Sequence, residues 1–200
     1  MMKILVTGAK GFIGKNLIAE LRNQKFYEIL EYDLDSSSDD LDAYCRTCDF
    51  VYHLAGVNRP REQKEFIEGN FGFTSILLNK LKLYENNSPI MLASSIQAAL
   101  DNPYGISKKA GEDLLFQYEK DTGSKVLVYR FPNVFGKWCK PNYNSAIATF
   151  AHNIARGLPI TINDPNVELN LVYIDDLVKE LISSLDNKEN RKDEFCYVNP

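Results

Sequence analysis

Three glycines between an apolar run and a helical pattern constrain this 200-residue chain more than any other feature. Residues 3–7 read Lys-Ile-Leu-Val-Thr, a short β-branched run typical of a buried parallel strand. Gly8, Gly11 and Gly14 follow directly, and apolar residues then recur at helical spacing. A strand, a glycine turn and a helix in this order predict a nucleotide-binding unit, because a helix amino terminus binds phosphates.

The three glycines have different roles in such a turn. Gly8 permits the tight turn, Gly11 lets the backbone approach a pyrophosphate, and Gly14 allows the helix to pack closely on the strand. The spacing is Gly-x-x-Gly-x-x-Gly, which differs from the Gly-x-Gly-x-x-Gly of the commonest dinucleotide fingerprint. The residues that we assign to the cofactor at this turn are Gly8, Lys10, Gly11, Phe12, Ile13 and Gly14.

Asp33 ends the second expected strand, residues 28–33, and lies 19 residues after Gly14. A carboxylate at this point hydrogen-bonds the ribose hydroxyls of NAD and repels the 2′-phosphate of NADP. Residues 34–40 are rich in acids and serines, so Asp33 is also readable as one more loop acid. Those serines could bind a phosphate and Lys10 could pair with it, so both NAD(H) and NADP(H) stay open as the cofactor.

Strand-like and helix-like runs alternate along the first two thirds of the chain. This alternation predicts an α/β fold, a Rossmann-like, doubly wound parallel sheet. We assign residues 1–135 to this nucleotide-binding domain and residues 136–200, where the regularity breaks, to a small and incomplete substrate-binding lobe. The later strands expected in the sheet are residues 50–54, 90–93 and 126–131.

The expected lobe has a simpler pattern. Asp175 and Asp176 precede an apolar helical run and are interpreted as its cap rather than as an acid–base or metal pair. The elements expected here are a helix at 146–156, a strand at 160–162 and a helix at 177–185.

Ser95, Tyr104 and Lys108 form the candidate catalytic set. Asn102 is a good helix cap and Pro103 suits the first helical position, so Tyr104 and Lys108 should share one helical face. A nearby ammonium lowers the pKa of a phenol, which is otherwise roughly 10. Tyr104 could then exchange a proton with a carbonyl or carbinol oxygen that Ser95 holds. The tyrosine–lysine spacing by itself is also common on solvated helix faces.

Four cysteines and two histidines raise the question of a metal or redox site. Cys45 and Cys48 have C-x-x-C spacing, but the other candidate ligands are widely scattered. We therefore interpret the cysteines as ordinary reduced thiols and the histidines as packing or capping residues, and we expect no metal.

The charge and hydropathy of the chain exclude other classes of partner. A net charge of −4 gives no basic footprint of the kind that nucleic-acid binding needs. No apolar run approaches the ~20 residues that span a bilayer, and the amino terminus leads directly into a strand without a signal peptide. The sequence therefore predicts a cytoplasmic protein that binds neither nucleic acid nor membrane.

Together these motifs resemble the extended short-chain dehydrogenase/reductases. The resemblance implies that Ser95, Tyr104 and Lys108 are catalytic, and that Tyr104 and Lys108 also contact the cofactor. It further implies cofactor contacts from Leu54, Ala55, Gly56 and Phe131. The stretches that carry it are Thr7-Gly8-x-x-Gly11-x-x-Gly14, Ser95, Tyr104-x-x-x-Lys108 and residues 53–56, 130–136 and 171–177.

Four stretches are also similar to the CapF-type enzymes of bacterial capsule synthesis. Members of that family use an amino-terminal part and NADPH to reduce a UDP-linked 4-keto-6-deoxy-aminosugar, and a carboxy-terminal cupin domain to epimerise the sugar first. This chain ends early for the fold and lacks the cupin domain, so the resemblance implies only the reductase half of the activity. It also implies a homodimer. The stretches are residues 55–60, 94–98, 101–105 and 136–145.

Two regions are expected to contact a UDP-sugar. Arg59 lies just beyond a strand end and could pair with a diphosphate, although it is equally readable as a surface arginine. Residues 137–145 offer the aromatic, amide and cationic groups that a UDP-sugar needs, and otherwise form a surface loop with Trp138 packed on the sheet. The substrate-binding residues that we predict are Asn58, Arg59, Ser95, Gln97, Asn133, Lys137, Trp138 and Asn142.

The expected activity is reduction of the C4 ketone of a nucleotide-linked 4-keto sugar. A nucleotide-sugar 4-epimerase uses the same three catalytic residues and stays an alternative. A 4,6-dehydratase is disfavoured, because Ile96 and Gln97 occupy the positions where that class has an Asp-Glu pair. The alternatives from another class are an NAD(P)-sensing module that does no chemistry, and a fragment that binds cofactor without closing over substrate.

Overall fold

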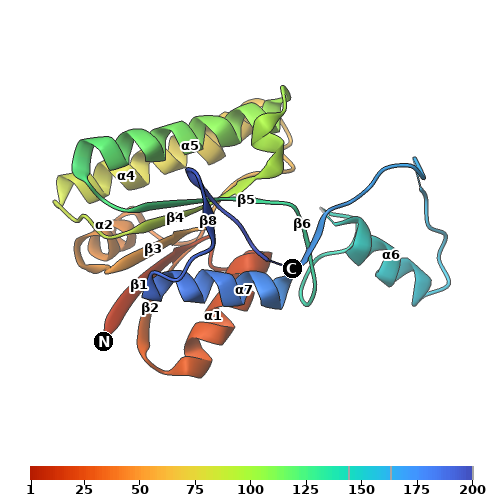
Figure 1. Ribbon diagram of the computed structural model, residues 1–200, viewed down its shortest axis with the longest axis horizontal. Coiled ribbons are helices and arrows are strands. Elements are labelled where there is room, and N and C mark those ends of the chain that lie inside the picture. Colours follow the sequence, from red (N-terminus) through yellow and green to blue (C-terminus); the bar gives the residue numbers. More distant parts are fainter. Residues whose placement is uncertain (144, 163, 200) are drawn as a thin grey trace.

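A mostly parallel sheet forms the centre of the protein, whose computed structural model describes residues 1–143, 145–162 and 164–199 (Figure 1). The seven strands follow the order β2-β1-β3-β4-β5-β9-β8, and β8 alone runs antiparallel to its neighbour in the described chain. This arrangement confirms the predicted α/β, doubly wound class. The strands are β1 (Met2–Thr7), β2 (Tyr27–Tyr32), β3 (Phe50–His53), β4 (Ile90–Ser95), β5 (Val126–Phe131), β8 (Arg191–Lys192) and β9 (Phe195–Cys196).

Helices cover both faces of this sheet (Figure 1). On one face, α1 (Phe12–Gln24) lies beside α7 (Ile174–Ser183). On the other face lie α2 (Ser38–Thr47), α4 (Phe73–Leu83) and α5 (Pro103–Thr122). The central strands β1, β3, β4 and β5 therefore bury both of their faces, which explains the continuous apolar runs in the sequence.

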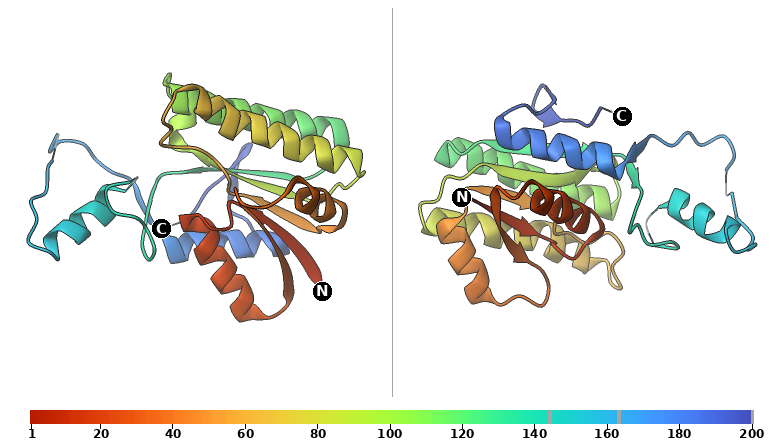
Figure 2. Two further views of the ribbon diagram at one scale, coloured as in Figure 1. Left: turned by 180° about the vertical axis from the view of Figure 1, so that it is seen from behind. Right: turned by 90° about the horizontal axis from the view of Figure 1, so that it is seen from below.

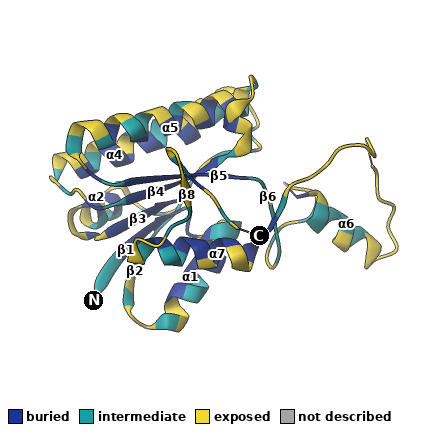
Figure 3. Ribbon diagram, in the orientation of Figure 1, coloured by how far each residue is buried: buried dark blue, intermediate teal, exposed yellow. Residues whose placement is uncertain are grey.

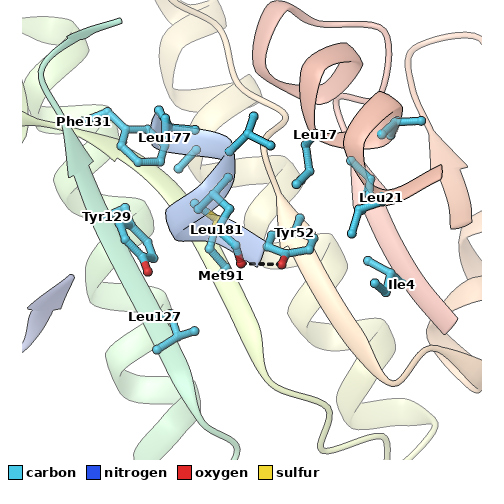
Figure 4. Close-up of a cluster of buried hydrophobic side chains, with 14 of the residues drawn as sticks. Ile4, Leu17, Leu21, Tyr52, Met91, Leu127, Tyr129, Phe131, Leu177 and Leu181 are labelled. Carbon is cyan, nitrogen blue, oxygen red and sulfur yellow. Dashed lines mark hydrogen bonds between the residues drawn. The ribbon is translucent and has the colours of Figure 1, made fainter. Parts of the chain in front are cut away.

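Most side chains in the core between the sheet and α1 and α7 are apolar. Leu17, Leu21, Leu177 and Leu181 from the two helices pack on β-strand side chains. The hydroxyl of Tyr52 donates a hydrogen bond to the carbonyl oxygen of Leu181 at 2.6 Å, so α7 is tied to the middle of the sheet (Figure 4).

The strand order places a topological switch at β1. The chain leaves β1 for β2 on one side and later returns to β3 on the other side. In open α/β sheets the loops diverge at such a point and leave a crevice at the carboxyl ends of the strands. Gly8 turns the chain there with a φ of +71°, and a Cβ at Gly8 would lie only 2.7 Å from the backbone nitrogen of Ala55. The glycine turn and the loop after β3 therefore meet at this edge.

The ends of α5 confirm the sequence prediction. The Asn102 side chain accepts the N–H of Gly105 at 2.9 Å, and Pro103 occupies the first helical position. Gly123 ends the helix with a left-handed φ of +73°, as expected for a glycine cap. Before α4, a short helix α3 (Lys64–Phe66) continues into a π-helical turn, η1 (Ile67–Gly72). A π-helical turn is rare and frequently lies at a functional site.

Residues 136–170 leave the body of the protein as an arm. The arm starts and ends at two short parallel strands, β6 (Asn133–Phe135) and β7 (Leu171–Tyr173). It contains α6 (Ala146–Ile154), in which no side chain is buried (Figure 3). Both views of Figure 2 show this arm clear of the sheet. Residues after 170 then return to the body, where α7 packs on α1 and β9 pairs with β5.

Two predictions for the late part of the chain are wrong. Residues 160–162 are exposed and form no strand, because no neighbouring strand lies beside them in the described arm. Asp175 and Asp176 do not cap a helix at residue 177, since α7 already begins at the buried Ile174. They lie in its first turn instead, where carboxylates face the positive end of the helix dipole. None of the helices described is long and apolar enough to cross a membrane.

Candidate active site

Ser95, Tyr104 and Lys108 come together at the carboxyl end of β4. Ser95 is the last residue of the strand, and its hydroxyl oxygen accepts the N–H of Gln97 at 3.2 Å. This hydrogen bond caps a short 3-10 turn, η2 (Ile96–Ala99), which leads the chain into α5. The predicted strand end and helix are thus joined by a turn that Ser95 itself starts.

Gly105 brings α5 into direct contact with this turn. A Cβ at Gly105 would overlap the carbonyl oxygen of Gln97 and lie 2.5 Å from that of Leu100. Only glycine therefore permits the observed approach, which presses the first turn of α5 against η2. The consequence is that Tyr104, one residue earlier, lies beside the end of β4.

Lys108 is buried one helical turn beyond Tyr104. Its side chain is 8% exposed, and Nζ donates a hydrogen bond to the carbonyl oxygen of Ala93 at 3.0 Å. Nζ also lies 5.9 Å from the centre of the Tyr104 ring. Burial lowers the pKa of Lys108 to about 8, and the charge of Glu112 opposes that decrease.

Burial, rather than the charge of Lys108, has the largest effect on the pKa of Tyr104. We predicted that the ammonium would lower the phenol pKa, but burial raises the pKa of Tyr104, and the Ser95 hydroxyl opposes that increase. The phenol loses contact with water, and the ammonium that should favour its anion points toward the carbonyl of Ala93. Without a bound substrate, Tyr104 is therefore a protonated hydroxyl, which suits a proton donor.

The glycine turn leaves the amino terminus of α1 without a side-chain cap. Gly11 occupies the cap position, and its N–H donates to the carbonyl oxygen of Gly8 at 3.0 Å. A Cβ at Gly14 would overlap the Gly8 carbonyl oxygen and lie 2.8 Å from that of Ala9. Phe12 and Ile13 begin the helix and pack partly against the core. The uncapped first turn and this compact backbone fit the pyrophosphate of a dinucleotide.

Asp33 supports the glycine turn from the end of β2. One carboxylate oxygen accepts the backbone N–H of Lys10 at 2.7 Å, and the other accepts that of Leu34 at 2.8 Å. The Lys10 ammonium forms an exposed ion pair with Asp35 and donates a hydrogen bond to its carboxylate, which raises the pKa of Lys10. The predicted ribose acid therefore already bonds to the loop that would hold the phosphates.

Asn70 is a site residue that sequence reasoning missed. It lies in the π-helical turn η1, and its amide oxygen accepts the N–H of Val57 at 2.9 Å. Its amide nitrogen donates to the Val57 carbonyl oxygen and to the Ser107 hydroxyl, each at 2.9 Å. A Cβ at Gly56 would lie 2.7 Å from this amide oxygen and 2.9 Å from the Lys108 nitrogen. Asn70 thus joins the loop after β3, which contains Leu54, Ala55 and Gly56, to α5.

His53 has the structural role that the sequence indicated. The ring is buried, with Nδ1 2.7 Å from the Thr7 hydroxyl and Nε2 2.8 Å from the Thr74 hydroxyl. Burial lowers the pKa of His53 to about 3, and the nearby Lys108 charge lowers it further. The imidazole is therefore neutral and links β1 to α4 through two hydroxyl groups.

The structure gathers some of the predicted substrate residues and separates others. Arg59, in the loop after β3, lies over the ring of Tyr143 at 5.8 Å, so this loop meets the loop before α6. Asn142 lies in the same loop, and its backbone N–H donates to the Thr149 hydroxyl at 2.9 Å. Asn133 uses its amide to donate to the carbonyl oxygen of Asn170 at 3.3 Å. Asn58 is half-buried, and Gln97 is exposed on η2.

Three residues predicted to contact a ligand make other contacts within the protein. Phe131 is 6% exposed and stacks on Tyr129 in the core, with ring centres 5.6 Å apart. Lys137 pairs with Asp175 at 3.1 Å, and its carbonyl oxygen accepts the amide of Asn16 at 3.1 Å, which fixes this stretch beside α1. Trp138 lines an open cavity of about 600 Å³ on the outer side of α1, whose other residues are Ala9, Lys10, Lys15, Ile18, Ala19, Arg22 and Glu31.

Burial makes the thiols of the C-x-x-C pair, Cys45 and Cys48, hard to ionise. All four are free, and burial raises the pKa of Cys45 to about 12 and that of Cys48 to about 11. Such thiols are poor nucleophiles. No cluster of potential metal ligands occurs among the described residues.

Comparison with known proteins agrees with this geometry. Residues 4–197 match the model of the "NAD dependent epimerase/dehydratase family". A UDP-2-acetamido-2,6-beta-L-arabino-hexul-4-ose reductase from Pseudomonas aeruginosa is 47% identical over 187 residues, which cover 94% of this chain and 50% of that protein. Its name gives a reductase of a nucleotide-linked ketosugar.

Solved structures show the same fold. The capsular polysaccharide assembling protein CapF from Staphylococcus aureus superposes with a TM-score of 0.89 and 43% identity over 100% of this chain and 53% of its own. A UDP-glucuronic acid 4-epimerase from Bacillus cereus in complex with NAD has a TM-score of 0.83 at 23% identity, covering 98% of this chain and 78% of its own, which shows the fold alone. The chain spans about half the length of the reductase and of CapF.

Proposed function

The chain belongs to the NAD dependent epimerase/dehydratase family, and we propose that it reduces the C4 ketone of a UDP-linked 4-keto-6-deoxy-N-acetylaminosugar. The observation that carries this proposal is the meeting of Ser95, Tyr104 and Lys108 at the end of β4, next to an uncapped glycine turn. The similarity to a reductase of such a sugar supports the substrate class. The similarity to CapF supports a place in the synthesis of capsule or surface polysaccharide.

The mechanism that we propose divides the reduction between two partners. A bound nicotinamide cofactor supplies a hydride to the ketone carbon. The Tyr104 hydroxyl donates its proton to the oxygen, so the C=O double bond becomes a C–O single bond with a new C–H bond on the carbon and a new O–H bond on the oxygen. The Ser95 hydroxyl donates a hydrogen bond to the same oxygen and fixes its position. Lys108 stabilises the phenolate that remains on Tyr104 and binds the nicotinamide ribose, and its charge makes proton donation easier.

For the cofactor, we propose NADPH. The carboxylate of Asp33 is already used by the backbone N–H groups of Lys10 and Leu34, so its hold on a free ribose hydroxyl is weakened. The exposed Lys10 ammonium can exchange Asp35 for a 2′-phosphate, and the half-buried Ser36 lies in the same loop. The carboxylates of Glu31, Asp33 and Asp35 repel a 2′-phosphate, so NADH, which has none, is the alternative cofactor.

For the substrate, we propose that it lies between the loop after β3 and the arm. Arg59 supplies a cation for the diphosphate, and Tyr143 beside it supplies an aromatic surface. We propose that Asn58, Gln97, Asn133 and Asn142 contribute amide groups around them. The substrate lobe is then the arm, residues 136–170, and the residues after it support the nucleotide-binding domain.

For the assembly, we propose a homodimer that pairs through α4 and α5. The outer faces of these helices carry Ile76, Leu83 and Ile106, whose side chains are half exposed or more.

The decisive experiment follows the loss of reduced-cofactor absorbance with a UDP-4-keto-6-deoxy-N-acetylhexosamine. NADPH and NADH are compared side by side, and Tyr104→Phe serves as the control. We expect stoichiometric oxidation of cofactor, faster with NADPH, and a decrease of at least about a hundredfold in kcat for the variant. An epimerase would interconvert the sugars without net loss of NAD(P)H. A sensing module would bind the cofactor without turnover, and Tyr104→Phe would change nothing.

A further inference from the structure

Glu112 is a buried acid that the proposed chemistry does not yet use. It lies in α5 one helical turn beyond Lys108, on the same face, and its residue is fully buried. One carboxylate oxygen accepts the Ser94 hydroxyl at 2.6 Å and the Arg130 Nε at 2.9 Å. The other accepts the Arg130 Nη2 at 2.6 Å. The buried carboxylate is thus paired with a guanidinium and hydrogen-bonded through both oxygens, which offsets its loss of contact with water.

These contacts connect the elements that carry the active site. Ser94 directly precedes Ser95 on β4 and lies opposite Arg130 in the register of β4 with β5. The Arg130 guanidinium lies 3.9 Å from the centre of the Phe195 ring on β9. A single carboxylate therefore joins α5 to β4 and β5, and it fixes the strand end with Ser95 relative to the helix with Lys108.

The charge of Glu112 also acts on Lys108. The groups that face the Lys108 ammonium from the surrounding elements are uncharged: the Tyr104 phenol, the neutral His53 ring, the Asn70 amide and the Ala93 carbonyl. Glu112 is the anion that raises the pKa of Lys108 against the effect of burial. Arg130 compensates part of this charge, and Asp113 and Glu194 act in turn on Arg130.

We propose that Glu112 is a positioning residue, whose buried carboxylate holds Ser95 and Lys108 at their working separation and keeps Lys108 an ammonium. The inference deepens the proposed function, because a charged Lys108 is what the reduction uses. No catalytic contact with the sugar or cofactor is assigned to Glu112 itself. Its influence passes through Ser94 and Lys108.

A direct test is the titration of Lys108 by NMR in protein with isotope-labelled lysine. The signal of Lys108 is assigned with Lys108→Arg and is separable, because its pKa of about 8 lies below that of other lysines. Glu112→Gln keeps the shape of the side chain but removes its charge. In this variant we expect the titration midpoint of Lys108 to fall by about one pH unit. Glu112→Asp keeps the charge and should restore most of that difference.

Asp113→Asn is the matched control. It removes one negative charge from the neighbouring position of the same helix, where the side chain is exposed and pairs with Lys109. We expect no change in the Lys108 midpoint there. If Glu112→Gln does not fold, the double variant Glu112→Gln, Arg130→Met removes both members of the pair and leaves no unpaired buried charge. Because the compensating charge of Arg130 is lost as well, the Lys108 midpoint should fall in the same direction but by a smaller amount. A midpoint that stays equal to that of the wild type in the folded variant overturns the proposal.

Turnover gives the second measurement. The alkaline limb of the kcat/KM profile should move to lower pH in Glu112→Gln by the same amount as the midpoint, whereas a merely structural defect would lower the rate at every pH. An alkaline limb that stays fixed while the midpoint moves contradicts the link to catalysis. If the wild type oxidises no cofactor, the proposed function fails, but the NMR titration still tests the effect of Glu112 on Lys108.

Discussion

Lys108 carries a positive charge in a place that water hardly reaches. Its ammonium donates one hydrogen bond to the Ala93 carbonyl, and its side chain is almost fully buried. An ammonium whose pKa falls from 10.5 in the unfolded chain to about 8 in the folded protein opposes folding below pH 8. The cost is about 3 kcal/mol near neutral pH. The candidate site therefore keeps a destabilising group, which is what the proposed role of Lys108 in the reduction would require.

We predict that Lys108→Met is more stable than the wild type near neutral pH by about 2–3 kcal/mol and inactive as a reductase. Since the unfolded chain binds the extra proton between the two pKa values, the wild type gains stability as the pH rises from about 8 to about 10.5. The advantage of the variant should therefore disappear over that range. Urea unfolding at several pH values measures it.

Lys109→Met is the appropriate control for this comparison. Lys109 is the next residue of α5, but its side chain is exposed and pairs with Asp113. An exposed ion pair contributes roughly 0–1 kcal/mol, so this variant should change stability little at any pH. If Lys108→Met is less stable than the wild type at neutral pH, the burial cost assigned to Lys108 is wrong.

At the scale of the elements, the close contact between η2 and α5 sets the geometry of the active site. We predict that Gly105→Ala destabilises the protein by roughly 2 kcal/mol or more, because the new methyl group would overlap the Gln97 carbonyl. The helix must shift to relieve the overlap, which separates Tyr104 from Ser95. Turnover should decrease further than the loss of folded protein explains. Thermal unfolding and kcat are the measurements.

Gly72→Ala tests whether any added methyl group has this effect. A Cβ at Gly72 would lie 3.8 Å from the Ile67 carbonyl oxygen, which is an ordinary contact, and its backbone is helical. Alanine also favours helix over glycine by up to about 1 kcal/mol. Equal losses in the two variants would mean that the η2–α5 contact has no special role.

Helices, strands and their ends could be predicted from the sequence where interactions between residues close in the sequence determine them. Residues 126–131 form a strand as expected, and Asn102 and Gly123 end α5 as expected, because capping and chain reversal depend on near neighbours. The strand at 160–162 failed for the opposite reason. A β-branched run becomes a strand only beside a partner, and partners depend on the whole fold.

The candidate site could be predicted from the sequence only in part, for the same reason. The sequence indicated that Ser95, Tyr104 and Lys108 lie near one another, because a strand end and one helical turn are local features. Asn70 and Glu112 act across elements, and their partners lie 13 and 18 residues away or more in the sequence. The one local signal for Glu112 was a carboxylate four residues after Lys108 on a helix face. The sequence did not indicate that Trp138 lies beside α1, because its position depends on how the loop passes that helix.

At the scale of the whole molecule, two segments far apart in the sequence form the proposed substrate entrance. Arg59 follows β3 and Tyr143 precedes α6, and they meet by a cation–π contact on the side where the arm leaves the body. Neither segment contains a regular hydrogen-bonded element at this point, and both are partly exposed. Segments of this kind exchange their amide hydrogens readily and become protected when a ligand orders them.

We predict that a UDP-sugar slows amide hydrogen exchange in residues 57–61 and 137–143 together, because one ligand should bridge the two loops. NADPH alone should protect residues 8–14 and 54–56 and leave residues 137–143 unchanged. Hydrogen exchange followed by mass spectrometry separates these segments. Tyr143→Ala should remove the sugar-dependent protection from both loops while the protection by NADPH persists. Protection confined to one loop would place the sugar on one side of the entrance only and would contradict a site closed by the arm.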